Sequence, residues 1–318
     1  MLKQETIEFN NKASLHPNFE AGINALSNVM KYKGVKSYGV MILGDPGCGK
    51  TFLLDTFQRM HPDIFTRRKT EVPMVRIDSP PEINAGSMYS ELLEALGDPC
   101  ADEGAPKSLR KRLKKLLKNL NSKLMSIDEA HDFLPSSGLS KTSIVLKVIK
   151  WLMNNTNVPL ILAGKPETKN LLDCDDQLEG RFLEVIKLEN FSCITTEKSL
   201  DSADFFDGLF SVFPRQTIGL EFLDEFESAD GEFHYKLNNN FSNLLRFILA
   251  TSGNPRLINK LLLEVIESTN KEDVLAIADF ATAWEKILQS KMVFKFNPFT
   301  ADLSVVKKNA SERGLYEE

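Results

Sequence analysis

The chain has 318 residues, of which 42% are hydrophobic and 26% charged, a composition typical of a globular protein with one large or two ordinary domains. It has no run of 18 apolar residues and no apolar signal core near its start, so we expect neither a membrane span nor secretion but a cytoplasmic protein. The net charge of −5 gives no overall attraction to nucleic acid, so any contact with DNA requires a local basic patch.

The first part of the chain, residues 1–18, has no clear periodicity and is expected to be an N-terminal extension. Apolar residues then recur every three or four positions from Phe19 to Met30, which predicts a helix over 19–33. The apolar run 38–43 predicts a short buried strand directly before a glycine-rich stretch.

That glycine-rich stretch, Gly-Asp-Pro-Gly-Cys-Gly-Lys-Thr at 44–51, matches every position of the phosphate-binding pattern G-x-x-x-x-G-K-[ST]. Glycines let backbone N–H groups close around phosphate oxygens, and the helix predicted from Gly49 directs the positive end of its dipole at them. Lys50 supplies a point charge for the β- and γ-phosphates, and Thr51 supplies a hydroxyl for Mg²⁺. The residues expected to contact the nucleotide here are Gly44, Asp45, Pro46, Gly47, Cys48, Gly49, Lys50, Thr51 and Phe52.

A strand over 72–78 and a helix over 87–96 are expected next, followed by a helix over 107–121 with leucines on one face and basic residues on the other. No acidic residue stands at the spacing of a helical ion pair, which favours an anion-binding face; a solvated surface helix is the alternative. No Asn or Gln is interleaved to read base edges, so we expect contact with the DNA backbone. The expected DNA contacts are Arg110, Lys111, Lys114, Lys115 and Lys118, with Lys141, expected in a loop, as a further candidate.

The apolar run 123–127 predicts a buried strand that ends in two carboxylates, Asp128 and Glu129. An acidic residue at the end of such a strand holds Mg²⁺ together with the loop threonine, which assigns Asp128 and Thr51 as metal ligands. The adjacent Glu129 is then placed to orient or activate water for attack on the γ-phosphate.

Strands alternate with helices from about residue 38 to 190, since a helix over 140–153 and strands over 158–164 and 183–188 follow. This alternation predicts an α/β fold with a parallel sheet covered on both faces and a ligand at the carboxyl ends of the strands. From Thr195 onward the pattern becomes mostly helical. The expected division is an extension at 1–18, an α/β nucleotide-binding domain at 19–194, a helical lid domain at 195–290 and a flexible tail at 291–318.

Together these parts resemble the AAA+ ATPases over residues 19–290, which implies a three-layer αβα domain with a helical lid that binds ATP and Mg²⁺. In such proteins a lid arginine reaches the γ-phosphate, and Arg256 in Gly-Asn-Pro-Arg at 253–256 matches that element. A neighbouring subunit supplies an arginine finger from before the fifth strand, where this chain has Arg181. The resemblance therefore implies catalytic roles for Lys50, Glu129, Arg181 and Arg256.

Among AAA+ branches, the TniB/TnsC transposition regulators are the most similar. The resemblance rests on Ile-Asp-Glu-Ala-His at 127–131, the strand from Pro159 to Glu167, Gly-Arg-Phe at 180–182 and Asn-Pro-Phe at 297–299. It implies ATP-dependent assembly of homo-oligomers on double-stranded DNA, contact with a target-selector protein and a transposase, and disassembly on hydrolysis. One departure is Lys165 after the fourth strand, where Thr or Asn is common as a sensor, and this departure favours slow hydrolysis.

Three other classes are considered. Asp-Glu-Ala-His at 128–131 spells a helicase motif, but the residues after 190 cannot supply the second α/β core that such a helicase needs. An AAA+ ATPase of the ExeA type, acting on a protein partner, shares the motifs but usually adds a membrane span. A nucleotide-binding scaffold without useful turnover remains open because of Lys165.

Overall fold

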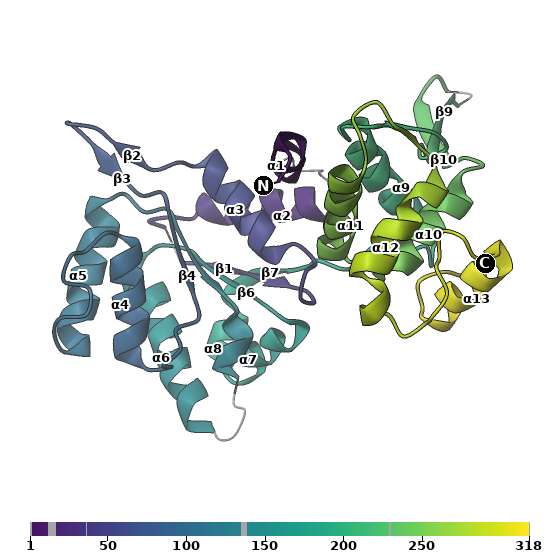
Figure 1. Ribbon diagram of the computed structural model, residues 1–318. Helices are drawn as coiled ribbons and strands as arrows, with labels where there is room; N and C mark the ends of the chain where they lie inside the picture. Colours follow the sequence, from purple (N-terminus) through teal and green to yellow (C-terminus); the bar gives the residue numbers. More distant parts are fainter. Residues whose placement is uncertain (1, 12–16, 36, 135–138, 229, 318) are drawn as a thin grey trace. The chain divides into compact units, whose positions relative to one another are not determined.

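The computed structural model describes residues 2–11, 17–35, 37–134, 139–228 and 230–317 (Figure 1). The chain forms two compact units, an α/β unit of Asn18–Leu188 and a helical unit made of Met1–Pro17 together with Glu189–Glu318. None of the helices in the described ranges is long and apolar enough to cross a membrane.

The α/β unit is organised around one five-stranded sheet, whose order is β4, β5, β6, β1, β7, with every neighbouring pair parallel. Every residue of β1, β5 and β6 is buried, as expected for central strands covered on both faces. The strands are β1 (Gly39–Leu43), β4 (Met74–Asp78), β5 (Leu124–Asp128), β6 (Leu160–Gly164) and β7 (Phe182–Lys187).

Successive residues of these strands enter different cores, because side chains alternate between the two faces of a sheet. Val40 and Ile42 pack with helices α2 (Pro17–Met30) and α3 (Lys50–Met60). Met41 and Leu43 belong to the core under α4 (Ala85–Ala95), α5 (Pro106–Asn119) and α6 (Leu139–Thr156). Two layers of helices therefore enclose the sheet, and the expected three-layer αβα fold is confirmed (Figure 1).

Short elements complete this unit. A small hairpin of β2 (Ile64–Phe65) and β3 (Thr70–Glu71), which the sequence pattern did not indicate, precedes β4. After β5 and β6 come the short helices η1 (Ala130–Phe133), η2 (Pro166–Lys169), α7 (Asn170–Asp173) and α8 (Asp176–Glu179).

The helical unit has an aromatic core in which Phe206, Phe210, Phe247 and Phe280 pack around one another and Trp284 donates from Nε1 to the Ala250 carbonyl at 2.9 Å. Its helices are α1 (Gln4–Asn10), α9 (Thr196–Ser211), α10 (Phe241–Thr251), α11 (Pro255–Ser268), α12 (Phe280–Ile287), flanked by η3 (Ile277–Asp279) and η4 (Gln289–Lys291), and α13 (Leu303–Glu312). Its strands are β8 (Gln216–Thr217), β11 (Val274–Leu275) and the hairpin β9 (Leu223–Glu227) and β10 (Phe233–Leu237).

The described residues 2–11 and 291–317, which lie outside the expected domains, belong to this unit. The segment 291–318, expected as a flexible tail, instead buries Phe294 and Phe299 and forms α13, whose Val306 and Ala310 are buried in the same core. The apolar positions of this segment are therefore core contacts. Near the start of the chain, α1 likewise buries Phe9 against Phe213, with ring centroids 5.4 Å apart.

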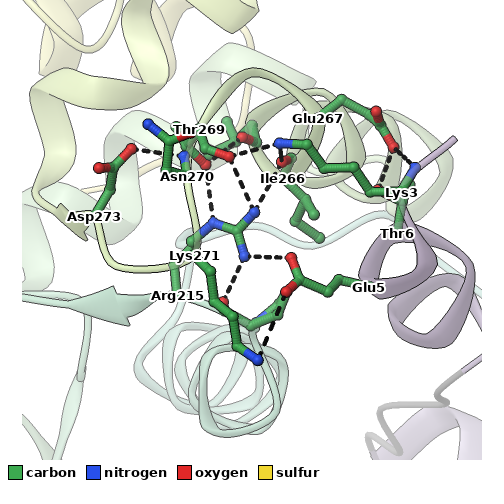
Figure 2. A network of polar contacts seen from close by, with 12 residues as sticks. Lys3, Glu5, Thr6, Arg215, Ile266, Glu267, Thr269, Asn270, Lys271 and Asp273 are labelled. Carbon is green, nitrogen blue, oxygen red and sulfur yellow. Dashed lines mark hydrogen bonds and ion pairs between the residues drawn. The ribbon is translucent and has the colours of Figure 1, made fainter.

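A polar network holds α1 to the carboxyl end of α11 (Figure 2). The Arg215 guanidinium, whose side chain is 1% exposed, donates to Glu5 Oε2 at 2.7 Å and to the Ile266 and Thr269 carbonyls at 3.0 and 3.1 Å. Lys3 Nζ donates to the same two carbonyls at 2.9 and 2.6 Å. Cations at this end of a helix satisfy carbonyls that lack helical partners and complement the helix dipole, and the Arg215 hydrogen bond holds the pKa of Glu5 below its usual value.

Candidate nucleotide site

The stretch from Gly44 to Thr51 forms a loop that joins the carboxyl end of β1 to the first turn of α3. Gly47 and Gly49 have φ values of 88° and 100°, a backbone region that favours glycine. A Cβ on Gly44 would lie 2.3 Å from the Leu188 carbonyl oxygen and 2.4 Å from Cys48 Sγ. Each glycine of the motif therefore has a structural reason, and the loop leads into the amino end of a helix.

Lys50 is 6% exposed although it carries a charge. Its Nζ donates to the Gly44 carbonyl at 2.7 Å and to the Asp45 carbonyl at 3.1 Å, so the loop itself orients the ammonium group. Burial raises the pKa of the neighbouring Cys48 thiol, which keeps this thiol neutral and free of negative charge near a phosphate. The loop thus presents a single buried cation.

Asp128, at the end of β5, meets Thr51 at the start of α3. Thr51 Oγ1 donates to Asp128 Oδ2 at 2.9 Å, and the Asp128 side chain is 2% exposed. A hydroxyl and a carboxylate oxygen are ligands that Mg²⁺ prefers, so this donor pair fits the metal that the motif implies. The structure brings these two sequence-predicted residues together.

Arg76 is a charged residue of this site that the sequence analysis missed. It lies in β4, and its guanidinium contacts Asp128 Oδ2 at 3.2 Å and also pairs with Asp55 of α3. The signal was an arginine inside the apolar strand Met74–Asp78, because a cation in a buried strand needs a partner. Nothing in the sequence said which carboxylate that partner is.

Glu129 differs from Asp128 in exposure, since its side chain is 51% exposed. Its backbone has φ 52°, a left-handed conformation, and its N–H donates to Asp128 Oδ1 at 2.9 Å. His131 Nδ1 lies 3.1 Å from Glu129 Oε2 but without the angles of a hydrogen bond. The site therefore pairs a buried carboxylate suited to a metal with an accessible one suited to water.

The end of β6 borders the same loop, because Gly44 donates to the Gly164 carbonyl at 3.1 Å. A Cβ on Gly164 would lie 2.3 Å from Thr168 Oγ1, so this position also requires glycine. Lys165 follows, half-buried, as the residue before η2. It is at the carboxyl edge of the sheet, where a sensor residue would stand.

Comparison with known proteins identifies the family. A family model described as the bacterial TniB protein matches residues 9–193, more than half of the chain. The chain belongs to the TniB family. Among curated proteins, none matches this TniB-family chain in sequence.

Solved structures of AAA+ proteins are similar to this TniB-family chain over most of its length. For ORC2 of Aeropyrum pernix (ADPNP-ADP complexes), the TM-score is 0.59 at 13% identity, with 89% of this chain and 72% of that chain covered. For Cdc6p of Pyrobaculum aerophilum it is 0.54 at 15% identity, covering 90% and 72%. For ORC1 of Aeropyrum pernix in complex with DNA it is 0.55 at 14% identity, covering 91% and 72%. At such identities the likeness shows the fold, and the expected AAA+ architecture is confirmed.

Neither of the two arginines expected at the nucleotide site borders the glycine-rich loop within the α/β unit of this TniB-family chain. Arg181 lies away from the loop, and Arg256 belongs to the helical unit. Arg181 stands just before β7, and its carbonyl accepts from Gly39 N–H at 2.9 Å. Gly39 begins β1, so Arg181 is at the amino edge of the sheet, about 13 Å of strand length from the edge where the loop starts. Arg256 is exposed in the first turn of α11, in the helical unit.

Gly253 and Asn254, which lie shortly before Arg256 in the sequence, have structural roles. Gly253 has φ 62°, and a Cβ there would lie 1.8 Å from the Phe191 carbonyl oxygen, so this position requires glycine. Asn254 accepts from Leu257 N–H at 3.4 Å at the start of α11 and donates to Asn190 Oδ1 at 3.2 Å. Arg256 is thus presented by a helix terminus whose position is fixed within its own unit.

The basic helix α5 packs through Leu109, Leu113 and Leu117, as its pattern predicts. Arg112, on the polar side, pairs with Asp98 at 3.0 Å, and the Arg110 guanidinium lies 5.6 Å from the centre of the Trp151 ring. Lysines at 111, 114, 115 and 118 are exposed, and the described structure gives none of them an ion-pair partner. Lys141, expected in a loop, belongs to α6, and its side chain lies outside the described part.

Proposed function

We propose that this TniB-family protein is an ATP-dependent, DNA-binding regulator of DNA transposition. It binds ATP with Mg²⁺ at the phosphate loop, assembles with copies of itself on double-stranded DNA, and links a target-selector protein to the transposase. Hydrolysis of ATP to ADP and phosphate then drives disassembly. The observation that carries the proposal is the meeting of Thr51 Oγ1 and Asp128 Oδ2 beside a buried Lys50 on a chain of this family.

Each residue of the site has a stated part in this proposal. The loop glycines expose backbone N–H groups to the phosphates, and Lys50 leaves the Gly44 carbonyl to contact the β- and γ-phosphates. Thr51 and Asp128 hold Mg²⁺, which when bound neutralises charge on the phosphate oxygens. Glu129, accessible at the strand end, orients water and takes its proton.

The two arginines complete the site in the assembled state. Arg256 contacts the γ-phosphate from the helical unit. Arg181 contacts the nucleotide of a neighbouring copy, a role supported by its place at the sheet edge opposite its own loop. The exposed lysines of α5 supply the local basic surface that a chain of net charge −5 needs in order to hold DNA phosphates.

The proposal is tested by two substitutions with distinct expected results. Lys50→Ala loses the charge-assisted contact to the polyphosphate. Its affinity for ATP is expected to fall by two to three decades, or about 3 to 4 kcal/mol, in a direct titration. Glu129→Gln keeps the shape and is expected to retain binding, to slow hydrolysis and to prolong DNA-bound oligomers seen by negative-stain imaging with duplex DNA. Unchanged ATP affinity in the first variant, or unchanged turnover in the second, contradicts the assignment of that residue. ATPase activity that responds to a protein partner but not to DNA would favour the ExeA-type alternative.

A further inference from the structure

The hairpin of β9 and β10 is an unusual surface of the helical unit. Among the described residues its two strands pair only with each other, so no further strand pairs with their outer backbone edges, and only at the root does a β9 amide, that of Leu223, donate to a side chain of α9. Proteins usually cover or charge such edges, because an open edge accepts a further strand. Three large aromatic side chains, Phe226, Phe233 and Tyr235, are 41%, 64% and 58% exposed on this short hairpin.

The root of the hairpin is held firmly to the unit. Asp207 of α9 accepts from Phe222 N–H at 2.8 Å and from Leu223 N–H at 3.0 Å. Leu223 and Leu237, which face each other in the register, pack against the aromatic core. The exposed part is therefore supported at its base, although a two-stranded hairpin alone is marginally stable.

The two faces of the hairpin differ in the charges that their side chains carry and in the contacts that these side chains make with one another. On one face Lys236 lies opposite Asp224, with its Nζ 5.8 Å from the centre of the Phe226 ring, and Phe226 lies beside His234. On that face the lysine lies over the aromatic ring and opposite a carboxylate in the register, although no ion pair joins Lys236 and Asp224 among the described residues.

The opposite face continues outward from the leucine pair at the root. Glu225 lies opposite Tyr235, and Glu227 lies opposite Phe233. Tyr235 Oη is 3.4 Å from Glu225 Oε1, and no cation of the described residues pairs with either glutamate. This face, named here the acidic aromatic face, consists of Glu225, Glu227, Phe233 and Tyr235.

Charge decides what kind of molecule fits this face. Residues 223–237 contain five carboxylates and one lysine, against a net charge of −5 for the whole chain. Such a surface repels DNA phosphates and anionic lipid, so it is not part of a nucleic-acid or membrane interface. Carboxylates beside exposed aromatic rings instead favour lysine and arginine, through ion pairs and cation–π contacts. The carboxylates are Asp224, Glu225, Glu227, Asp230 and Glu232.

We propose that the acidic aromatic face docks a basic, extended segment of a partner protein, which adds to an open edge of the hairpin as a strand. Alternate lysine or arginine side chains of that segment lie over Phe233 and Tyr235 and pair with Glu225 and Glu227. Backbone pairing supplies part of the affinity, and the side chains supply the choice of a basic partner. This interaction surface consists of residues other than those assigned to the nucleotide site, and it does not depend on the proposed DNA contacts of α5.

The test uses the full chain and a short fluorescent peptide in which Lys and Val alternate, with binding measured by anisotropy at several salt concentrations. Wild-type protein is expected to bind this peptide with an affinity that falls as salt rises, and to bind neither the Glu–Val counterpart nor a proline-interrupted basic peptide of equal charge. Phe233→Ser with Tyr235→Ser, and Glu225→Gln with Glu227→Gln, are each expected to weaken binding about tenfold. Hydrogen exchange is expected to slow at the hairpin amides in the complex.

Matched surface changes elsewhere control for nonspecific effects. Phe65→Ser removes a ring that is 71% exposed on another hairpin, and Glu94→Gln with Glu312→Gln removes two exposed charges from helices. These controls are expected to bind like wild type, and all variants are expected to keep ATP affinity and the far-ultraviolet circular dichroism of a folded chain. Equal binding by wild type and the hairpin variants, or no binding by wild type, overturns the proposal. Sedimentation that shows hairpin-dependent self-association without peptide binding would mean that a second copy occupies this face.

Discussion

Asp128 has two possible cationic partners, and the structure shows one of them. Arg76 sits in contact with the oxygen of Asp128 that also accepts from Thr51. A carboxylate that is 2% exposed requires a compensating charge, and Arg76 supplies it. Mg²⁺ at this place would compete with Arg76 or share Asp128 with it.

Replacing Arg76 with Met is expected to make the fold depend on divalent metal. Without Mg²⁺ the variant leaves Asp128 with the hydrogen bonds from Thr51 and from Glu129 N–H but without a cation, at a cost of about 1 to 3 kcal/mol, which lowers the melting temperature by several degrees. Added Mg²⁺ with an ATP analogue is expected to raise the melting temperature more in the variant than in wild type, with Arg76→Lys in between. Thermal melts with and without metal measure this, and equal responses to Mg²⁺ in the variant and wild type would contradict it.

Asp207 is expected to make the stability of the helical unit depend on pH. Burial raises its pKa from 3.8 to about 6, against the opposing hydrogen bonds from Phe222 and Leu223 N–H. The folded state therefore keeps this proton up to about pH 6, whereas the unfolded chain releases it near pH 4. By linkage, this group makes the free energy of unfolding fall as pH rises from about 4 to 6, by about 1 to 2 kcal/mol after allowance for solvent, and contributes no slope above that range.

The check is urea denaturation of wild type and Asp207→Asn across that range. The variant is expected to lose this slope, and to be less stable by about 1 kcal/mol where one N–H loses its acceptor. Nearby Asp204 and Glu221 remain in both proteins, so the difference between the two profiles isolates Asp207. Parallel profiles would show that Asp207 titrates at its ordinary value.

The candidate site shows what can be read from residues alone. The loop residues and the Asp128–Glu129 pair were predicted because each motif is contiguous and its chemistry fixes the spacing. Arg76 was not, because its partners Asp55 and Asp128 are brought to it by the packing of β4 against β5 and α3. Pairings between distant charges follow from the fold and not from local pattern.

At the scale of elements, α5 shows that the residue pattern of a single helix does not reveal ion pairs with residues outside that helix. The absence of acidic residues at helical ion-pair spacing was a correct reading of the helix, yet Arg112 pairs with Asp98 from the preceding loop. Arg112 was not among the expected DNA contacts, and the lysines at 111, 114, 115 and 118, which were, are exposed. Their role in binding DNA stays a prediction.

Charge reversal of Lys111 and Lys115 to Glu is expected to lower DNA affinity in the presence of an ATP analogue and leave ATP affinity unchanged. Each lost phosphate contact reduces the magnitude of the salt slope by about one, equally on any duplex sequence. Lys147→Glu with Lys308→Glu, two exposed helical lysines elsewhere, is the matched control. Binding curves at several salt concentrations that superimpose on wild type would mean that α5 is a solvated surface.

The three central strands β1, β5 and β6 were predictable because buried parallel strands are continuous apolar runs. The edge strands β4 and β7 were predicted from shorter apolar runs that include charged residues. The strands β9 and β10 were missed because nearly all their side chains are exposed and their apolar residues do not mark a buried run. The alternation of Phe233, Tyr235 and Leu237 with polar residues was a signal for β10 that was not used. The helix α13 was missed because its apolar positions are few and lie within a polar run, and only the aromatic core of the unit gives them a place.

At the scale of the whole molecule, the sheet places Arg181 and the phosphate loop at opposite edges. If Arg181 acts on a neighbour's nucleotide, subunits with different defects can complement one another. Mixing Arg181→Ala with Lys50→Ala subunits is expected to restore part of the ATPase activity that each lacks alone, because some interfaces then carry both intact halves. Sedimentation of a strictly monomeric protein with ATP and DNA, or a mixture no more active than its parts, would count against this role.

The docking of α1 has a consequence for how the chain is made. The contacts Glu5–Arg215 and Lys3–Thr269 join residues that are 210 and 266 positions apart in the sequence. The segment that forms α1 therefore leaves the ribosome long before the helix it binds exists. At ordinary translation speeds that interval is roughly 10 to 50 s, enough for the whole α/β unit to be synthesised and to fold first. During that time Phe9 has no core to enter, and a nascent chain stalled anywhere in 18–188 exposes it. Synthesis thus sets the order of assembly, with the glycine-rich loop and Asp128 in place before the unit that carries Arg256 can close around its earliest helix.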